Sequence, residues 1–485
     1  MALVLHSHMP YVEGLGTWPF GEEWLWEAVS TVYLPLLHLL EAADAPVTLG
    51  MTPVLCDQLE TLPAEPGDRL LRFLTETRRE VHAEDAKGLQ DTGFPELAAE
   101  VRRAAMDYTR AEQALRDGAR EPLARIAALG ERAPVELMTS SATHAVLPLL
   151  ASDAGLRLQL AAGAASHERR FGSWAGGLWL PECAYEPGLE RELADHGVRH
   201  FCVDQTDVHG LGAPEQLEPV ATEAGPVAVP IDWQTVQLVW SGTTGYPVHP
   251  VYRDYHRRTF HDLRPWSNGG HPYRPEEAAR LAREHARDFV GHCLGRLEAH
   301  WAGRGRPGLL CFALDTELLG HWWYEGQTWL KAVFEEASAQ GLDLVTLEQG
   351  LERVEPVQRE LAPSSWGDGK DFSTWDCPDV AEIAFKSRTA ELRTVAAAAQ
   401  AGPMGDDRRA ALERAARELL ALQSSDWAFQ VINDLAADYP QRRMAAHGAA
   451  NDAALSGLGD SDAVSPDPAL RNLAPDLDLA PLLAP

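Results

Sequence analysis

Two acidic residues follow short apolar runs in this sequence and could form a catalytic pair. Glu182 comes after the run GGLWL at 176–180, and Asp315 follows GLLCFAL at 308–314. In a parallel barrel the active site lies at the carboxyl ends of the strands, so side chains that follow different strands can meet in one opening. Paired carboxylates act on glycosides, with one attacking or stabilising the sugar while the other donates a proton. The two positions therefore suggest glycoside chemistry.

Histidine and tryptophan residues occur around these acids in a pattern that suits a sugar site. His6 and His8 end the first apolar run, and His144 comes shortly after another. The chain has 15 tryptophans, many of them in or beside predicted loops, where flat rings can lie against the faces of sugars. The side chains that we expect to contact a substrate are His6, His8, His144, Trp18, Trp240, Trp266, His321, Trp322, Trp366, Trp375 and Asp426.

Each of these signals also has a plain structural interpretation. Glu182 and Asp315 could instead cap the helices that follow them, since acids are common at that position. The pair His6 and His8 could ligate a metal, but no cysteine or acid lies beside it at an obvious ligand spacing. We therefore predict neither a metal nor an organic cofactor.

Strands and helices alternate along most of the chain. The apolar runs at 2–6, 45–50, 133–138, 176–180, 198–203, 308–314 and 342–347 are bounded by Gly, Pro or polar residues, as strands are. Helical patterns lie between many of them, which predicts an α/β fold built on a parallel barrel. One such helix should begin near Pro187 and end at Gly197.

Three further segments differ from this alternation. Residues 66–130 are rich in Ala, Arg, Glu and Leu and predict a helical insertion. Residues 356–450 keep a helical period without strands, which predicts a helical C-terminal domain after a barrel over 1–355. Residues 451–485 lack usable periodicity, so we expect a disordered tail.

Composition limits the partners. The 485 residues carry 72 acidic and 42 basic side chains, a net charge of −30, without a cluster of Lys and Arg. Nucleic acid and anionic membranes are therefore poor partners, whereas a neutral sugar polymer would not be repelled. Six cysteines without a CxxC pair predict reduced thiols, and the start of the chain has no charged leader, so we expect a cytoplasmic protein. The oligomeric state stays open.

Five ordered motifs resemble those of glycoside hydrolase family 57, and within it those of the 1,4-α-glucan branching enzymes. They are HSHMPYV, SATHAVLPLL, GLWLPECAY, LDTELLGHWWYEG and SSWGDGKDFSTW. The resemblance implies an incomplete (β/α)7 barrel with a helical insertion and a helical C-terminal domain that completes the cleft. It also implies a substrate, α-1,4-glucan, and a product with α-1,6 branches.

The resemblance further implies roles for single residues. Glu182 would be the nucleophile and Asp315 the general acid/base, while His8 and His144 would line the donor sugar subsite and Trp366 and Trp375 would border the cleft. The segment 205–235, which leads into WSGTTGYP, differs from the loop that shields the reaction from water in the family. An α-amylase, a 4-α-glucanotransferase and a catalytically silent glucan-binding protein therefore remain as alternatives.

Overall fold

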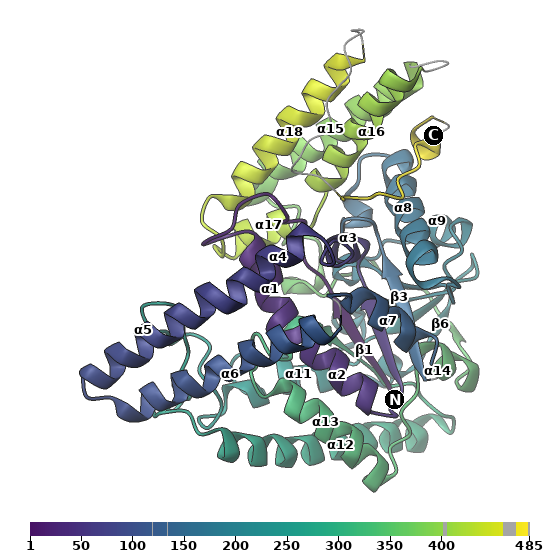
Figure 1. Ribbon diagram of the computed structural model, residues 1–485. Helices are drawn as coiled ribbons and strands as arrows, with labels where there is room; N and C mark the ends of the chain where they lie inside the picture. Colours follow the sequence, from purple (N-terminus) through teal and green to yellow (C-terminus); the bar gives the residue numbers. More distant parts are fainter. Residues whose placement is uncertain (119, 133, 401–404, 459–471, 484–485) are drawn as a thin grey trace.

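The computed structural model describes residues 1–118, 120–132, 134–400, 405–458 and 472–483 (Figure 1). Within these residues one sheet of nine strands has the order β8-β1-β2-β3-β4-β5-β7-β6-β9. Its strands are β1 (Ala2–Ser7), β2 (Val47–Met51), β3 (Val135–Ser140), β4 (Gly177–Trp179), β5 (His200–Val203), β6 (Val220–Ala221), β7 (Val227–Pro230), β8 (Cys311–Asp315) and β9 (Val357–Gln358).

Seven of these strands run parallel and form an incomplete barrel. All neighbouring pairs from β8 through β1 to β7 are parallel. The curled sheet closes through a single bridge between Ile231, just after β7, and Cys311 of β8. The short strands β6 and β9 extend the sheet beyond β7, with β6 antiparallel to it. The prediction of an incomplete (β/α)7 barrel is confirmed.

Alternating side chains divide each strand between two cores. Leu3 and Leu5 of β1 pack outward with the surrounding helices, whereas Ala2 and Val4 pack inward with residues of β3, β4, β5, β7 and β8. The two-residue period of a strand then places His6 on the same inner face as Val4, and Asp315 on the same inner face as Ala313. Both functional candidates therefore point into the barrel at its carboxyl end.

The strand predictions were right for six runs and wrong for one. The run at 342–347 forms only a bridge between Ala2 and Val345, because Thr346 caps a helix that begins at Leu347. Strand β7 was missed because it is short and ends in a proline. The predicted helix after Glu182 begins at Leu189, with Gly188 as its N-cap, and Gly197 follows it with a φ of 80°.

Helices surround the barrel and link its strands. They are α1 (Glu22–Ala28), α2 (Leu34–Ala42), α3 (Pro53–Leu59), α8 (Asp153–Phe171), α9 (Leu189–Asp195), α10 (Thr206–His209), α11 (Trp233–Trp240), α12 (Pro275–Arg304), α13 (Gly326–Gln340) and α14 (Leu347–Arg353).

The helical insertion lies between β2 and β3. It contains α4 (Glu65–Arg72), α5 (Arg78–Asp91), α6 (Pro95–Asp117) and α7 (Pro122–Gly130), and α5 and α6 project from the barrel as a hairpin (Figure 1). The loop before α12 binds this hairpin, where His261 Nδ1 lies 2.7 Å from Asp85 Oδ1. The insertion is therefore attached to the body at this loop as well as at its root, and Tyr324 adds a further contact by donating to Asp107 of α6 at 2.7 Å.

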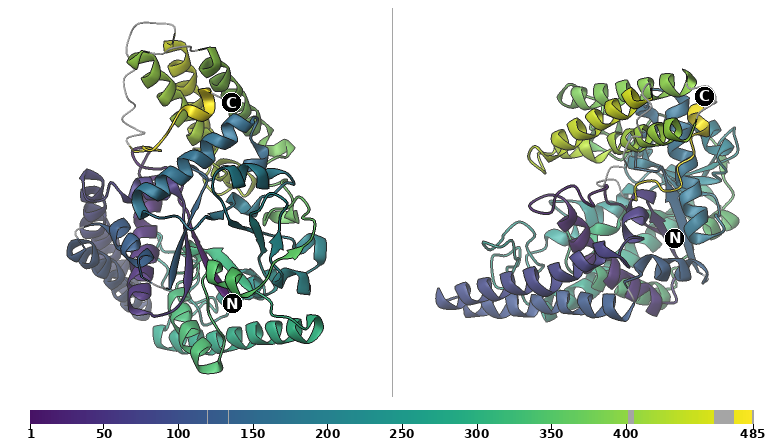
Figure 2. Two further views of the ribbon diagram at one scale, coloured as in Figure 1. Left: turned by 90° about the vertical axis from the view of Figure 1, so that its right-hand side faces the viewer. Right: turned by 45° about the horizontal axis from the view of Figure 1, so that its top comes forward.

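The C-terminal helices cover the end of the barrel where the strands finish. They are α15 (Ala381–Gln400), α16 (Asp406–Leu422), α17 (Asp426–Ile432) and α18 (Tyr439–Gly457). Both views in Figure 2 place them at the same end of the sheet. A bridge between Ala145 and Ser424 joins the loop after β3 to the loop before α17. This region thus forms one wall over the strand ends, whereas the exact boundary at 355/356 stays a prediction.

The prediction of a disordered tail over 451–485 is wrong for the described part of that segment. Residues 451–457 finish α18, and α19 (Ala480–Leu483) lies on the body, where Leu473, Leu479 and Leu482 are buried. Residues 459–471 and 484–485 lie outside the described residues. Sequence periodicity missed this segment because it is held by isolated leucines and polar contacts rather than by a long helix.

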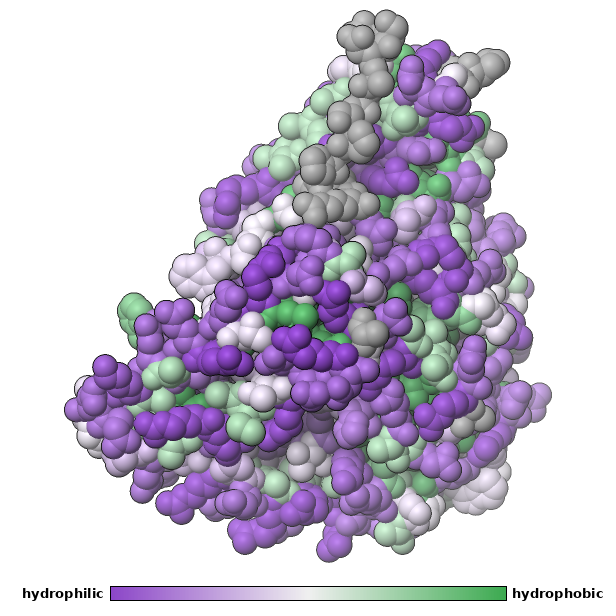
Figure 3. Space-filling model, viewed as in Figure 1, coloured by the Kyte–Doolittle hydropathy of each residue, from purple (hydrophilic) through white to green (hydrophobic). Residues whose placement is uncertain are grey.

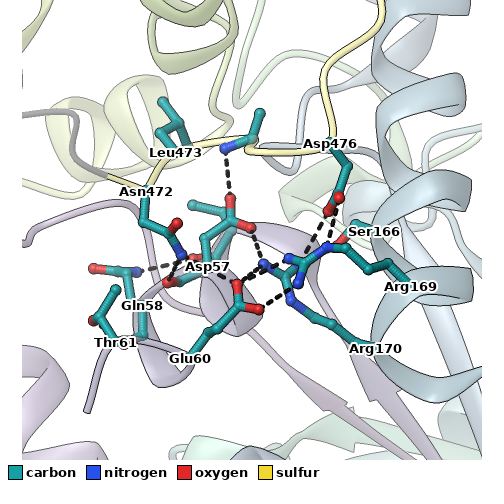
Figure 4. A network of polar contacts seen from close by, with 12 residues as sticks. Asp57, Gln58, Glu60, Thr61, Ser166, Arg169, Arg170, Asn472, Leu473 and Asp476 are labelled. Carbon is teal, nitrogen blue, oxygen red and sulfur yellow. Dashed lines mark hydrogen bonds and ion pairs between the residues drawn. The ribbon is translucent and has the colours of Figure 1, made fainter. Parts of the chain in front are cut away.

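A polar network fixes the tail to α3 and α8 (Figure 4). Arg170 Nη2 donates to Asp57 Oδ1 at 2.8 Å, and the backbone N–H of Ala474 donates to Asp57 Oδ2 at 2.8 Å. Asn472 Nδ2 donates to the carbonyl of Asp57 at 2.7 Å, and Arg169 Nε donates to Asp476 Oδ1 at 2.5 Å. Burial raises the pKa of Asp57 to about 7 although Arg170 opposes the shift.

The surface of the protein is mostly polar on the face that Figure 3 shows. Hydrophilic residues predominate on the face seen in Figure 3, and apolar residues occur there in small patches. Among the described residues no helix is both long and apolar enough to span a bilayer. All six cysteines belong to the described residues and are free thiols, as predicted.

Candidate active site

Glu182 lies immediately beyond β4 in a strained backbone conformation. Its φ is 62° and its ψ is 18°, a left-handed conformation that costs a non-glycine residue free energy. Glu182 Oε2 accepts a hydrogen bond from Trp366 Nε1 at 2.8 Å. Helix α9 instead begins after Gly188. The capping interpretation of Glu182 is therefore wrong.

Asp315 is the last residue of β8 and pairs in register with His6 of β1. It precedes a short 3-10 helix, but within the described residues its side chain makes no capping hydrogen bond to that helix. Burial raises the pKa of Asp315 well above its ordinary value, and the charges of Glu317, Glu182 and Asp426 raise it further. The carboxyl group is therefore suited to carry a proton at neutral pH.

Glu182 is in a different electrostatic position. Burial raises its pKa, and the net pKa stays raised although hydrogen bonds from Trp366 and Ser425 stabilise the carboxylate and oppose the shift. When the surroundings of two carboxyl groups push their pKa values apart, the group with the lower pKa can act as base or nucleophile and the other as acid. Here the donors favour the ionised form of Glu182, while Asp315 has only like charges as neighbours in this balance.

Three of the four predicted histidines, His6, His8 and His144, form one stack beside Glu182. The rings of His8 and His144 lie 4.0 Å apart between centroids, and His6 Nε2 lies 2.9 Å from His144 Nε2. His144 Nδ1 is 2.8 Å from Ser425 Oγ and 3.6 Å from Glu182 Oε1. Burial lowers the pKa of both His6 and His144 well below the ordinary value, so these two rings are neutral.

His8 is the charged member of the stack. Burial lowers its pKa, but the charge and hydrogen bond of Asp426 outweigh that effect, and the net pKa is raised. His8 Nε2 lies 2.8 Å from Asp426 Oδ2, which also accepts a hydrogen bond from Ser424. Asp426 is the first residue of α17, so the helical region supplies a charge to the barrel's opening.

Glu317, Tyr33 and Ser425 also belong to this site, although they were not predicted from the sequence. Glu317 Oε1 accepts hydrogen bonds from Tyr33 at 2.5 Å and from the backbone N–H of His8 at 3.2 Å. Burial raises its pKa to about 7. The signal for Glu317 was present, since it stands two residues after Asp315 in the same motif; Ser425 likewise precedes the predicted Asp426.

Among the predicted aromatic residues, the structure places Trp366 directly on Glu182. Its ring also packs edge-on against Trp179, with centroids 4.9 Å apart, and Trp179 stacks on His6. Trp375 is buried in a separate cluster with Val146 and Ala184. Its proposed role at the cleft stays a prediction.

The remaining predicted aromatic residues lie in loops or at helix ends. Trp18, Trp240 and Trp322 are exposed. Trp322 packs on Tyr255 with centroids 4.5 Å apart, and the ring of His321 lies near both. Trp266 supports the guanidinium of Arg257. Their contact with a substrate also stays a prediction.

The described residues contain no group of three His, Cys, Asp or Glu side chains that could hold a metal ion. Within this part of the chain, the nitrogen atoms of His8 are directed to Asp426 and Thr52. These contacts support a hydrogen-bonding and stacking role for the His6–His8 pair, and the absence of a metal stays a prediction.

The sequence profile of glycosyl hydrolase family 57 matches residues 2–363 of this chain. The chain belongs to this family. A second profile, described as the C-terminal region of 1,4-alpha-glucan branching enzymes, matches residues 386–475. The family-57 match covers the barrel with its insertion, and the second covers the helical region that supplies Ser425 and Asp426.

Individual known proteins resemble the chain over most of its length. A probable 1,4-alpha-glucan branching enzyme of Mycobacterium tuberculosis is 36% identical over 92% of this chain and 89% of its own. The crystal structure of a branching enzyme from Pyrococcus horikoshii is similar with a TM-score of 0.92 and 30% identity, covering 100% of this chain and 96% of the other. An alpha-amylase from Thermotoga maritima gives 0.81 and 25%, covering 95% and 93%.

Proposed function

We propose that this protein is a 1,4-α-glucan branching enzyme, which cuts an α-1,4-glucan chain and transfers the cut segment to a 6-hydroxyl of an acceptor chain. The observation that carries this proposal is the branching-enzyme C-terminal region at 386–475. That region contains Ser425 and Asp426, which contact His144 and His8 beside Glu182. The part of the chain that is typical of branching enzymes is therefore also part of the candidate active site.

The two carboxyl groups divide the reaction. In its ionised form, Glu182 attacks the anomeric carbon and forms a glycosyl ester, while Asp315 gives its proton to the departing glycosidic oxygen. Asp315, now ionised, then takes the proton of the acceptor 6-hydroxyl as that oxygen attacks the ester. Two inversions at the anomeric carbon leave an α-linked branch, so the reaction retains configuration.

The histidine stack supports this chemistry in two ways. His6 and His144 are neutral and can exchange hydrogen bonds with sugar hydroxyls without adding charge beside Asp315. His8 is cationic and offsets part of the negative charge of Glu182, Asp426 and Glu317. We expect these three rings to bind the donor sugar, and the exposed aromatic residues to bind more distant glucose units.

Hydrolysis is the second candidate, and the similarity to an alpha-amylase from Thermotoga maritima favours it. Both reactions share the glycosyl ester and differ in whether water or a sugar hydroxyl resolves it. A catalytically silent glucan-binding protein is the third candidate. It is opposed by the strained backbone of Glu182 and by the raised pKa of Asp315, because neither is needed for binding alone.

Incubation with amylose tests the proposal. A branching enzyme creates α-1,6 linkages, counted by proton NMR or by enzymatic debranching, with few new reducing ends. A hydrolase creates reducing ends without α-1,6 linkages, and a 4-α-glucanotransferase redistributes chain lengths with neither. A silent binder leaves the amylose unchanged, and the Glu182→Gln variant then behaves as the unchanged protein does.

The free thiols also support a location. Six unpaired cysteines suit a reducing compartment. We propose that the protein works in the cytoplasm on glycogen-type glucan, and thiol labelling of freshly lysed cells tests this.

A further inference from the structure

The loop that carries Trp366 determines where the indole N–H points. Besides the side-chain hydrogen bond to Glu182, the backbone N–H of Trp366 donates to the carbonyl of Glu182 at 2.9 Å. Ser364 and Tyr185 form a bridge just beside these contacts. The segment before Trp366 is therefore attached to the segment that carries Glu182, but these contacts do not fix the turn that follows.

The following turn is held by its own hydrogen bonds and by the partly buried ammonium group of Lys370. Lys370 Nζ lies 2.9 Å from Asp204 Oδ2, and the Asp204 side chain is fully buried just beyond β5. Lys370 Nζ also lies 3.3 Å from the centroid of the Trp233 ring and donates to the carbonyl of Trp366 at 3.3 Å. One ammonium group thus joins the strand end, the start of α11 and the backbone of the residue that binds Glu182.

Lys370 makes this contact from a left-handed backbone conformation, which is unfavourable for a residue other than glycine. Its φ is 60°, in the left-handed region that favours glycine, and it directly follows Gly369 at a φ of 77°. The N–H of Lys370 donates to the carbonyl of Gly367 at 3.0 Å, and its carbonyl accepts from Ser365 at 3.1 Å. A glycine would adopt this turn at lower cost, so the gain from a lysine must come from its side chain.

We propose that Lys370 and Asp204 are positioning residues that hold the Trp366 indole on Glu182, so that the carboxylate of the nucleophile stays aimed and keeps its indole donor. The role assigned to Glu182 rests on the function proposed above, whereas the geometry of Lys370, Asp204 and Trp366 does not. The Trp366 N–H uses Oε2 of Glu182, and His144 faces Oε1. The two oxygens therefore have separate neighbours, and loss of the Trp366 contact leaves Oε2 without this donor.

Several titratable or charged groups lie around Glu182 and Lys370, and they determine how the loss of the Trp366 hydrogen bond changes the pKa of Glu182. Glu182 is faced by His8 and Asp426 in addition to His144, and its charge acts on Asp315. Lys370 faces Asp204, with Cys183 beside both. The Trp366 hydrogen bond lowers the pKa of Glu182. Its loss should therefore raise that pKa and move the acidic limb of the kcat/KM profile to higher pH.

The test uses the full chain and three variants of Lys370, one of which also changes Asp204. Lys370→Met removes the cation, Lys370→Arg keeps it, and a double variant, Lys370→Met with Asp204→Leu, also removes the carboxylate that would otherwise be buried without a partner. Lys331→Met is the matched control, because Lys331 lies on the exposed face of α13, with Nζ 4.0 Å from Glu335. Melting temperature and branching kinetics are measured for each.

We expect Lys370→Met to lower kcat about 10- to 100-fold with little change in KM, as misplacement of a reacting group does. The acidic limb of its kcat/KM profile should move to higher pH by at least about half a pH unit. The double variant should regain melting temperature without regaining kcat, and Lys370→Arg should recover most of both. A double variant that recovers kcat together with its melting temperature would show that the pair only supports folding and would overturn the proposal.

A spectroscopic measurement keeps the proposal testable if the wild-type protein makes no branches, an outcome that would defeat the proposed function by itself. The indole N–H of Trp366, assigned by its absence in Trp366→Phe, should titrate with Glu182 in nitrogen-15 NMR spectra. In Lys370→Met that signal should move upfield and exchange faster with water. An unchanged Trp366 signal in a folded Lys370→Met protein would refute the positioning role whatever the activity.

Discussion

His8 Nε2 lies 2.8 Å from Asp426 Oδ2, an ion pair that joins the first strand of the barrel to a helix of the C-terminal region. Both side chains are largely buried, and each shifts the pKa of the other toward its charged form. The pair links the fold to the candidate site, because His8 also stacks on His144 beside Glu182. It therefore gives stability and site geometry a common pH dependence.

The first prediction follows from that pair. Asp426→Asn should lower the free energy of unfolding by up to about 3 kcal/mol. The loss is smaller than for a buried cation that must stay charged, because His8 can lose its proton when Asp426 is removed. The pKa of folded His8 is raised, so the contribution is complete below about pH 6.5 and is lost as the pH rises through the raised value. On the acid side it is lost as the pH falls below about 4 toward the lowered pKa of Asp426, about 2.

Chemical denaturation of the unchanged protein and of Asp426→Asn at pH 5.5, 7.5 and 9.5 measures the difference in their free energies of unfolding. It should be largest at pH 5.5 and smallest at pH 9.5. An equal difference at all three pH values would mean that the ion pair does not stabilise the fold.

The second prediction concerns the nucleophile. Glu182→Gln should lose roughly 10⁴-fold or more in turnover while it melts normally and still binds glucan, because the neutral amide cannot form the glycosyl ester. Azide should partly rescue Glu182→Ala with a glycosyl azide of inverted configuration. The matched control, Asp315→Ala, should give the retained azide. Normal branching by a folded Glu182→Gln protein would remove Glu182 from the mechanism.

The third prediction concerns the acid. The charge of Glu317 contributes to the raised pKa of Asp315, so Glu317→Gln should lower that pKa. Because Asp315 must be protonated to give its proton, the basic limb of kcat/KM should move to lower pH. Tyr33→Phe, which keeps the Glu317 carboxyl group, should move the limb less. A limb that stays in place in Glu317→Gln would assign it to another group.

The fourth prediction tests the attachment of the tail. The side chain of Leu482 is fully buried, whereas that of its neighbour Leu483 is 38% exposed. Leu482→Ala should lower the free energy of unfolding by about 2–5 kcal/mol, and Leu483→Ala should change it by less than about 1 kcal/mol. Thermal unfolding of both variants measures the contrast. Equal and negligible effects would mean that α19 does not pack on the body in solution.

The fifth prediction is that exhaustive chelation leaves branching activity unchanged. The proposed mechanism uses two carboxyl groups and three histidines, and it contains no step that needs a metal. Activity is measured after dialysis against EDTA and after readdition of zinc. Activity that is lost and then restored by zinc would assign the His6–His8 pair to a metal.

Much of the fold could be predicted from local patterns, because barrel strands buried on both faces are short apolar runs. Two of the exceptions have local causes. A capped helix start at Thr346 replaced a predicted strand, and the short strand β7 ends in Pro230. The tail was missed because its packing depends on partners such as Asp57 and Arg170, far away in the sequence.

The candidate site could be predicted only as a set of residues. The motifs indicated Glu182, Asp315, His8, His144 and Asp426, but they did not indicate which atoms meet. The hydrogen bond from Trp366 to Glu182 depends on a turn fixed by Lys370 and on the closing of the barrel. Such geometry is set by contacts distant in sequence, which periodicity and motif spacing do not describe.

The contact between residues 8 and 426 also has a consequence for synthesis. A ribosome completes the barrel strands before it reaches the helices that carry Ser425 and Asp426. Until those residues leave the exit tunnel, His8 and His144 lack the partners that fix them in the finished protein. A nascent chain therefore cannot assemble the whole site, and the newborn protein gains its activity only after most of its length has been translated.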